Sequence, residues 1–198
     1  MTTTRKVILS FDDGPTPSEP LHKILAILQR NQIKAEFYVL GKSVKGNPKD
    51  TMAIFNAGHK IQNHSWDHID LSIASEVNVL EQIKSTQDAV EKITGYKPTR
   101  IRPPYGAGGW PKSLDPELAK VAKDLGLTIH NWDIDTNDWK KPRGLGSVKI
   151  KRIRAQIERT GKPRLNILMH VRKETARDLQ GFIDLLKGMG FDFARPSS

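Results

Sequence analysis

Runs of apolar residues and stretches of helical periodicity alternate along almost the whole chain. Short runs rich in β-branched and aromatic residues predict strands at 5–11, 34–39, 59–63, 99–102, 127–132, 165–170 and 191–193. Between these runs, amphipathic segments predict helices at 18–31, 48–57, 75–95, 115–125, 147–160 and 173–187. This alternation predicts parallel strands with the helices outside them.

The helical segments carry their apolar residues on one face. The segment 18–31 places Leu21, Ile24 and Leu25 on the same side, and Gly95 is a natural stop for the segment 75–95. The number of repeats and the chain length favour a closed or nearly closed barrel over an open sheet. We therefore expect an α/β fold: a distorted (β/α) barrel with about seven strands, similar to a TIM barrel.

Nothing along the chain indicates a domain boundary. There is no linker, low-complexity tract or internal repeat, so we expect a single domain over residues 1–198. The chain has no cysteine, which excludes disulfides, cysteine-ligated zinc and a thiol nucleophile. No apolar segment is long enough for a signal peptide or a membrane span. The compartment stays open: a processed domain would be extracellular or in the cell envelope, and otherwise the protein would be cytoplasmic.

The net charge is +10, from 32 Lys and Arg against 22 Asp and Glu, and it is concentrated in one part of the chain. Basic residues cluster between Lys140 and Arg164, where Glu158 is the single acid. Such a cluster attracts polyanions. The helical part, 147–160, is most simply an outer helix with a solvated face. No aromatic residue interrupts the cluster, and this argues against nucleic-acid binding.

Residues typical of catalytic sites follow the predicted strands, at the barrel end where such folds place their chemistry. They are Asp12 and Asp13 after the first strand, His64 and His68 after the third, Arg102 and Tyr105 after the fourth, Asp135, Asp138 and Trp139 after the fifth, and His170 at the end of the sixth. Each cluster alone is a weak signal, but five accidental clusters in this order would be rare.

The adjacent acids Asp12 and Asp13 need a positive partner, because an uncompensated buried carboxylate costs several kcal/mol or more. His64 and His68 are four residues apart, and in a helical turn both imidazoles would lie on one side and could share a metal. Two histidines and one carboxylate leave coordination positions open, as catalytic metals require. One aspartate is therefore expected to bind a cation, and Arg102 is the candidate that holds the other ionised.

The motifs "SFDDG", "HSWDH", "RPPYG", "DTNDW" and "LMH", in this order, resemble those of the polysaccharide deacetylase family, also called carbohydrate esterase family 4 or the NodB-homology domain. The resemblance runs from Ser10 to His170. It implies a distorted (β/α) barrel and removal of acetyl groups from N- or O-acetylated sugars. It also implies that Asp13, His64 and His68 bind a divalent metal, for which we expect Zn²⁺, with other transition metals such as Co²⁺ as alternatives.

The resemblance also assigns the remaining roles. Asp12 would be the general base, and Arg102 would pair with it and fix its orientation. Tyr105 would offer its backbone N–H to the oxyanion. Asp138 would orient the general acid His170, while the acetyl pocket would be walled by Trp139 and Leu168.

Trp110 lies on a catalytic-face loop, where stacking on a sugar and simple loop packing are equally consistent with the sequence. The favoured function is a metal-dependent hydrolase that removes N-acetyl groups from glycans containing N-acetylglucosamine, of the peptidoglycan or chitin type. An acetylxylan esterase is the enzymatic alternative, and a non-catalytic basic barrel that binds glycan or nucleic acid is the other. We expect a monomer whose partner is an acetylated glycan, with no nucleic acid bound.

Overall fold

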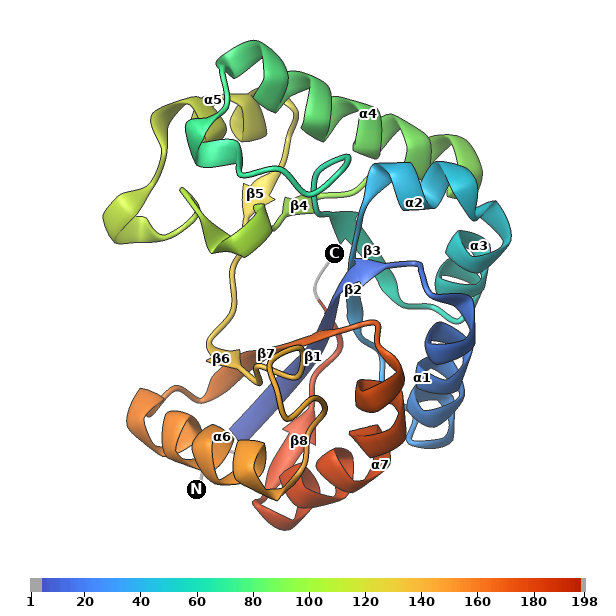
Figure 1. The fold of residues 1–198 in the computed structure, drawn as a ribbon, viewed down its shortest axis with the longest axis vertical. Helices are drawn as coiled ribbons and strands as arrows, with labels where there is room; N and C mark the ends of the chain where they lie inside the picture. The colour runs from blue at the N-terminus through green and yellow to red at the C-terminus, as the bar shows by residue number, and fades with distance from the viewer. Residues whose placement is uncertain (1–4, 197–198) are drawn as a thin grey trace.

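The computed structural model describes residues 5–196, so the ends of the predicted domain, residues 1–4 and 197–198, lie outside the described part (Figure 1). The strands are β1 (Arg5–Gly14), β2 (Glu36–Val39), β3 (Lys60–Asn63), β4 (Arg100–Ile101), β5 (Thr128–Ile129), β6 (Ile134–Asp135), β7 (Arg164–His170) and β8 (Phe191–Phe193). The α-helices are α1 (Ser18–Arg30), α2 (Gly41–Gly46), α3 (Pro48–Asn56), α4 (Glu76–Thr94), α5 (Pro116–Asp124), α6 (Ser147–Thr160) and α7 (Lys173–Gly188).

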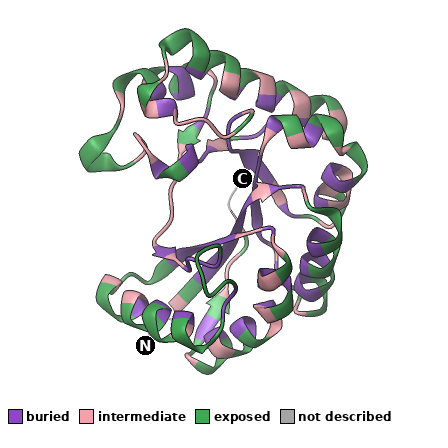
Figure 2. Ribbon diagram, in the orientation of Figure 1, coloured by how far each residue is buried: buried purple, intermediate pink, exposed green. Residues whose placement is uncertain are grey.

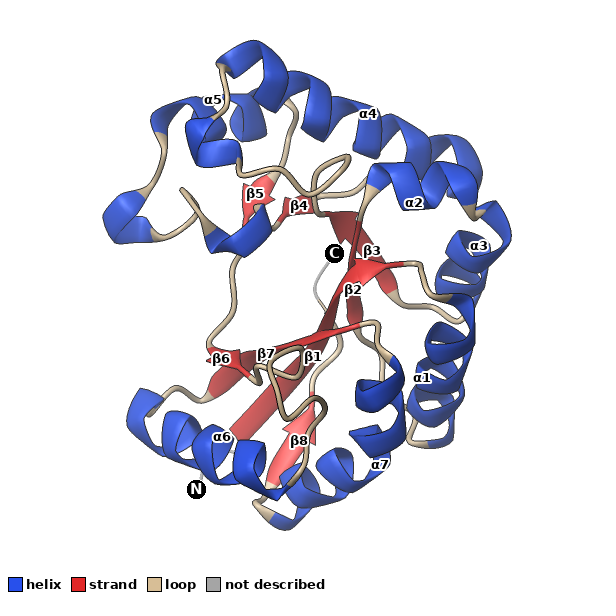
Figure 3. Ribbon diagram, in the orientation of Figure 1, coloured by secondary structure: helices blue, strands red, loops and turns tan. Residues whose placement is uncertain are grey.

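The strands form one curled parallel sheet, a half-barrel surrounded by helices (Figures 1 and 3). The order is β5-β4-β3-β2-β1-β7-β6, with β8 paired to β1. Within the described residues no pairing joins β5 to β6, so the barrel stays open there, and the connection between these strands runs across the open side (Figure 1). The predicted distorted barrel is confirmed.

The predicted strand 127–132 is wrong in its extent. The chain leaves the sheet after Ile129, at the end of β5, and enters it again at Ile134 as β6, which pairs with β7 on the far side. The intervening segment 130–133 is polar and only half-buried, so it makes the crossing rather than lining the core. The other predicted strands and helices are present with small shifts at their ends, while the short helix α2 was not predicted.

Burial follows the layers of the fold (Figure 2). The central strands β1, β2 and β7 are almost wholly buried, and the apolar face of α1, with Leu21 and Ile24, packs into the same core. Phe11 of β1 stacks on Phe37 of β2 with ring centroids 5.1 Å apart. A smaller apolar cluster lies between α4, α5 and β4. This packing fixes the strand ends that carry the site.

None of the helices described is at once long enough and apolar enough to cross a membrane.

Candidate active site

The register of β1 and β7 places two of the predicted residues side by side. Asp12 and His170 are Cα partners at the ends of these parallel strands. The backbone carbonyl of Asp12 accepts a hydrogen bond from the N–H of Val171 at 3.1 Å, which continues the pairing past the strand end. Asp13 has a positive φ of 68°, so the chain departs from the extended strand there, and the carboxylates of both Asp12 and Asp13 face the same cavity.

Asp13, His64 and His68 come together as a possible metal site. The Oδ1 atom of Asp13 lies 3.7 Å from Nε2 of His64 and 3.5 Å from Nε2 of His68. Ligand bonds of about 2.1 Å in tetrahedral geometry would separate ligand atoms by about 3.4 Å, so these distances fit one shared ion.

The helical turn predicted for the two histidines is wrong. His64 and His68 lie on an irregular loop after β3, in which Ser65 and His68 have positive φ angles of 69° and 68°. The N–H of His68 donates to Oγ of Ser65 at 3.1 Å, and this local bond stabilises the turn. A tight loop with left-handed backbone conformation, rather than a helical turn, therefore brings both imidazoles to Asp13.

The protonation of His64 suits a metal ligand. Its Nδ1–H donates to the backbone carbonyl of Arg102 at 2.7 Å, which leaves Nε2 with its lone pair towards Asp13. Burial lowers the pKa of His64 to about 3, so the ring is neutral at ordinary pH. Oδ1 of Asp13 is buried without a hydrogen-bond partner among the described residues, and a cation would satisfy it.

Asp12 lies against a buried guanidinium. Nη1 of Arg102 donates to Oδ1 of Asp12 at 2.6 Å and to Oγ of Ser10 at 3.1 Å. Nη2 of the same side chain donates to Oδ1 of Asn166 at 3.0 Å, and the guanidinium lies 3.8 Å from the ring centroid of Tyr38. Arg102 is therefore locked in place, and it fixes one oxygen of Asp12 while leaving the other free.

Burial raises the pKa of Asp12 above its usual value, although Arg102 and His170 lower it in part. Oδ2 of Asp12 lies 3.7 Å from Nε2 of His64, beside the possible metal site. A carboxylate with a raised pKa and one oxygen not bonded to Arg102 is suited to accept a proton.

His170 is held by Asp138. Its Nδ1 lies 2.7 Å from Oδ1 of Asp138, and its backbone N–H donates to Oδ2 of the same carboxylate at 2.8 Å. The hydroxyl of Thr175 donates to Oδ2 at 2.5 Å. Burial alone would lower the pKa of His170, but the hydrogen bond and the negative charge of Asp138 outweigh it and raise the pKa. Nε2 of His170 is then the atom left for chemistry.

These groups line a cavity of about 310 Å³. Its walls are Asp12, Asp13, His64, His68, Tyr105, Trp132, Asp135, Trp139, Leu168, His170 and Arg172. The structure thus gathers the predicted metal ligands, base and acid around one space, with Arg102 and Asp138 directly behind them.

Comparison with known proteins agrees with this arrangement. The model of the family described as polysaccharide deacetylase matches residues 1–130. The chain belongs to the polysaccharide deacetylase family. The resemblance that its motifs indicated is confirmed.

Relatives in this family include enzymes and a pseudoenzyme. The chain is 38% identical over 192 residues to the peptidoglycan-N-acetylglucosamine deacetylase of Listeria monocytogenes, covering 96% of this chain and 38% of that protein. A family 4 carbohydrate esterase from Streptomyces lividans, solved with acetate, is 28% identical with a TM-score of 0.82, covering 99% of this chain and 95% of that one. A family 4 pseudoenzyme from Bacillus anthracis is 27% identical with a TM-score of 0.81, covering 98% of this chain and 64% of that one. Because the fold is shared by enzymes and a pseudoenzyme, the residues of the site decide whether a member of the family is active.

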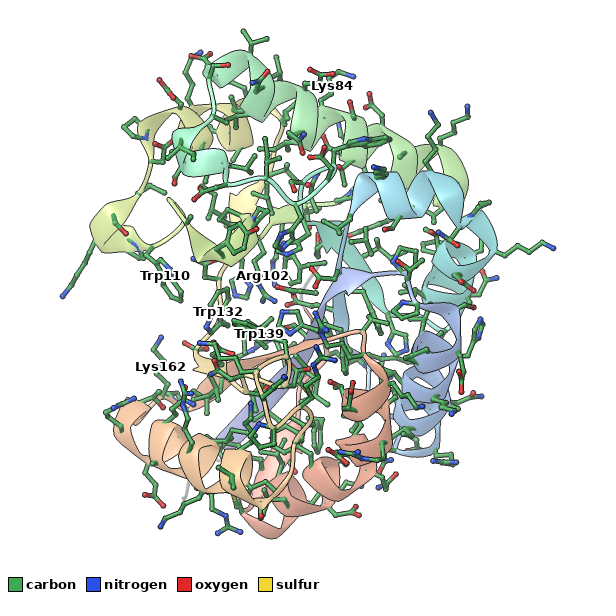
Figure 4. The ribbon with its side chains drawn as sticks, viewed as in Figure 1. Lys84, Arg102, Trp110, Trp132, Trp139 and Lys162 are labelled. Carbon is green, nitrogen blue, oxygen red and sulfur yellow. The ribbon has the colours of Figure 1, made fainter. Side chains whose placement is uncertain are left out.

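The aromatic residues around the site have different positions, and three of them, Trp110, Trp132 and Trp139, lie towards the open side of the half-barrel (Figure 4). Trp139 and Leu168, which the family resemblance assigns to an acetyl pocket, line the cavity. Trp110 does not line it but packs edge-on against Trp132, with ring centroids 5.2 Å apart. Tyr105 has a positive φ of 61°, and its ring lies edge-on to His68 at 4.7 Å. The unusual backbone turn at Tyr105 fits a residue whose backbone N–H, rather than its side chain, has a role.

Several residues of the candidate site were not predicted from the sequence. Trp132 and Arg172 line the cavity, while Ser10, Glu36 and Asn166 form a buried network behind Asp12. Oδ1 of Asn166 accepts from Arg102, and its Nδ2 donates to Oε2 of Glu36 at 2.9 Å. The sequence does contain an indication of this network, because each of its members is a polar residue within an otherwise apolar strand.

The basic segment between Lys140 and Arg164 has two parts. Most of its charged side chains on α6 are exposed, as predicted for an outer helix. Lys149 is an exception: it is buried, and its Nζ donates to the backbone carbonyls of Asn137 and Lys140. Lys149 thus braces the loop that carries Asp138 and Trp139, which is a structural use of charge that the pattern did not indicate.

Proposed function

We propose that this chain is a metal-dependent polysaccharide deacetylase that hydrolyses the N-acetyl groups of N-acetylglucosamine-containing glycans and releases acetate. The observation that carries the proposal is the placement of Asp12 opposite His170, with the Asp13–His64–His68 group lining the same cavity. Relatives named as peptidoglycan and chitin deacetylases support a substrate of this class. The chain spans only 38% of the length of its Listeria relative, so the proposal concerns the catalytic domain.

Asp13, His64 and His68 would hold the metal, and Zn²⁺ suits one carboxylate and two imidazoles. When bound, such an ion supplies Lewis-acid polarisation of the acetyl carbonyl and lowers the pKa of a water molecule. Co²⁺ is the alternative among the transition metals that imidazole ligands accept.

Asp12 is proposed to take the proton of the attacking water. Its Oδ2 faces the metal ligands, while Arg102 holds Oδ1 at 2.6 Å and so keeps the acceptor oxygen aimed at the cavity. The raised pKa of Asp12 makes it a stronger base than an exposed aspartate, while the positive charge of Arg102 favours its ionised form.

His170 is proposed to protonate the departing nitrogen. Its raised pKa keeps it charged at a pH where an ordinary histidine is partly neutral, and Asp138 fixes the ring so that Nε2 faces the cavity. The backbone N–H of Tyr105 would stabilise the oxyanion. Trp139 and Leu168 would hold the acetyl methyl group.

The decisive experiment measures acetate release from chitooligosaccharides, peptidoglycan and acetylated xylan, with and without a chelator. We expect release from the N-acetylated substrates, loss of at least 95% of it on chelation, and recovery with Zn²⁺. Release from acetylated xylan alone would make the chain an O-acetyl esterase. No release from any substrate by metal-loaded protein would favour a non-catalytic binding barrel.

The monomeric state, the single domain and the compartment stay predictions.

A further inference from the structure

A second cavity, of about 460 Å³, adjoins the active-site cavity. The two share three of their lining residues, Asp13, His68 and Arg172. The remaining walls of the second cavity come from the turn after β1, from Leu40 and α2, and from the start of α7. A glycan whose acetylated sugar fills the first cavity would therefore place a neighbouring group in the second.

Arg172 lies at the junction of the two cavities without a full set of partners. Its Nε–H is buried and has no hydrogen-bond partner within residues 5–196. A buried donor without a partner costs about 1–3 kcal/mol, which a ligand atom would recover. The Nε and Nη donors of a guanidinium form a planar fork that matches the two oxygens of a carboxylate.

The other charges of the second cavity decide which ligand this fork would meet. Asp13 and His68 belong to the possible metal site. The negative charge of Asp13 would therefore compensate the metal ion and would not balance Arg172. Lys173 adds a positive charge to the wall of the second cavity, whereas the negative charge of Glu174 would repel a bound anion. Pro17, Leu40 and Val171 supply apolar surface. A small group that combines a carboxylate with an apolar part fits this lining.

We propose that Arg172 binds a carboxylate carried by the glycan next to the acetylated sugar, so that the chain acts on anionic glycans such as peptidoglycan in preference to neutral ones such as chitin. This inference rests on the proposed deacetylase function and specifies its substrate. The carboxylate has two possible sources in peptidoglycan, the lactyl group of N-acetylmuramic acid or the stem peptide attached to it.

The test compares kcat/KM for acetate release by the metal-loaded protein on four substrates. They are an N-acetylglucosamine tetramer, a peptidoglycan tetrasaccharide with free lactyl carboxylates, its methyl ester, and the tetrasaccharide with stem peptides. We expect the wild type to prefer at least one carboxylate-bearing substrate over the neutral ones by about tenfold or more, since charged bidentate pairs are worth this much. The carboxylate-bearing substrate with the highest kcat/KM identifies the source of the carboxylate.

Arg172→Gln should lower that preference about tenfold, mainly through KM, and Arg172→Lys should restore part of it because charge returns without the fork. Arg154→Gln, which removes the same charge from the exposed surface of α6, is the matched control and should keep the preference. An unchanged ratio in Arg172→Gln, or an equal fall in Arg154→Gln, would overturn the inference. If the wild type releases no acetate from any of the four substrates, the deacetylase proposal itself fails.

Discussion

Two buried carboxylates support the candidate site, and their surroundings differ. Asp12 is 2% exposed, and within the described chain its carboxylate accepts hydrogen bonds from Arg102 alone. Asp138 is 0% exposed, and its carboxylate accepts from the backbone N–H and Nδ1 of His170 and from the hydroxyl of Thr175. Burial raises the pKa of Asp12, whereas at Asp138 the hydrogen bonds outweigh burial and lower the pKa.

The difference shows how hydrogen-bond number, more than the presence of a cation, sets the role of a buried acid. Each donor to the charged form stabilises it, so a carboxylate with several donors stays ionised and acts by orienting its partners. A carboxylate with an oxygen left free and a raised pKa can take up a proton. Asp12 therefore suits the base, and Asp138 suits the group that orients His170.

The largest expected effect is the loss of the base. Asp12→Asn keeps the size of the side chain but cannot accept the water proton, so kcat should fall by about two to four orders of magnitude. Acetate release at saturating substrate measures it. Glu158→Gln, which removes the same charge from the exposed face of α6, is the control and should change kcat less than twofold. A fall of less than tenfold in Asp12→Asn would end the assignment of Asp12 as the base.

The next effect concerns pH. His170 must be protonated to act as the acid, so activity should decline as pH rises through its raised pKa. Asp138→Asn removes the charge that raises this pKa. The alkaline limb of the kcat profile should therefore move to lower pH, and kcat at its optimum should fall about 10–100-fold, as for other orienting carboxylates. A lower kcat with an unmoved alkaline limb would show that Asp138 has only a structural role.

The smallest effect is on stability. Thr175→Val removes the hydroxyl that donates to Asp138 and should lower the free energy of unfolding by about 1.5–3 kcal/mol, because the acceptor is charged. Thr86→Val is the control: its hydroxyl donates to the neutral backbone carbonyl of Gln82, so the loss should be about 0.5–1.5 kcal/mol. Urea unfolding of both variants measures the difference.

The difference in stability cost between Thr175→Val and Thr86→Val should depend on pH. The pKa of Asp138 is lowered in the folded protein, so its ionised form contributes stability above the unfolded pKa of about 3.9, and this stability is lost as pH falls through the folded value. The excess cost of Thr175→Val over Thr86→Val should shrink in that acid range. An equal cost of the two variants at every pH would show that Asp138 gains nothing special from Thr175.

Sequence reasoning located the site because strand ends are readable from apolar runs. Asp12 lies near the end of β1 and His170 is the last residue of β7, two long buried strands, so their shared edge could be inferred before any coordinates. β6 could not be predicted, since two residues carry no periodicity, and 130–133 looks like the continuation of β5. The loop of His64 and His68 was misread because a spacing of four fits a helix, while the left-handed backbone at Ser65 leaves no mark in the sequence.

The residues around the cavity show a second limit. Arg172 enters both cavities only because β7 ends beside β1 and α7 begins there, so its position depends on tertiary packing. The network behind Asp12 was readable in part: Glu36 within "AEFYV" and Asn166 within "LNILM" are polar residues in buried strands. Such residues need partners, but only the sheet order shows which ones they have: Arg102 donates to Asn166, and Arg100 pairs with Glu36.

Two adjacent and chemically identical acids, Asp12 and Asp13, are proposed to act as a base and a metal ligand. Oδ2 of Asp12 and Oδ1 of Asp13 both lie 3.7 Å from Nε2 of His64, so that distance alone does not separate them; the contact of Asp13 with His68 does. The direct measurement is zinc content by elemental analysis beside acetate release, in Asp12→Asn and Asp13→Asn. We expect Asp12→Asn to keep its metal and lose turnover, and Asp13→Asn to lose both. Loss of metal from Asp12→Asn with retention in Asp13→Asn would contradict this expectation and exchange the two roles.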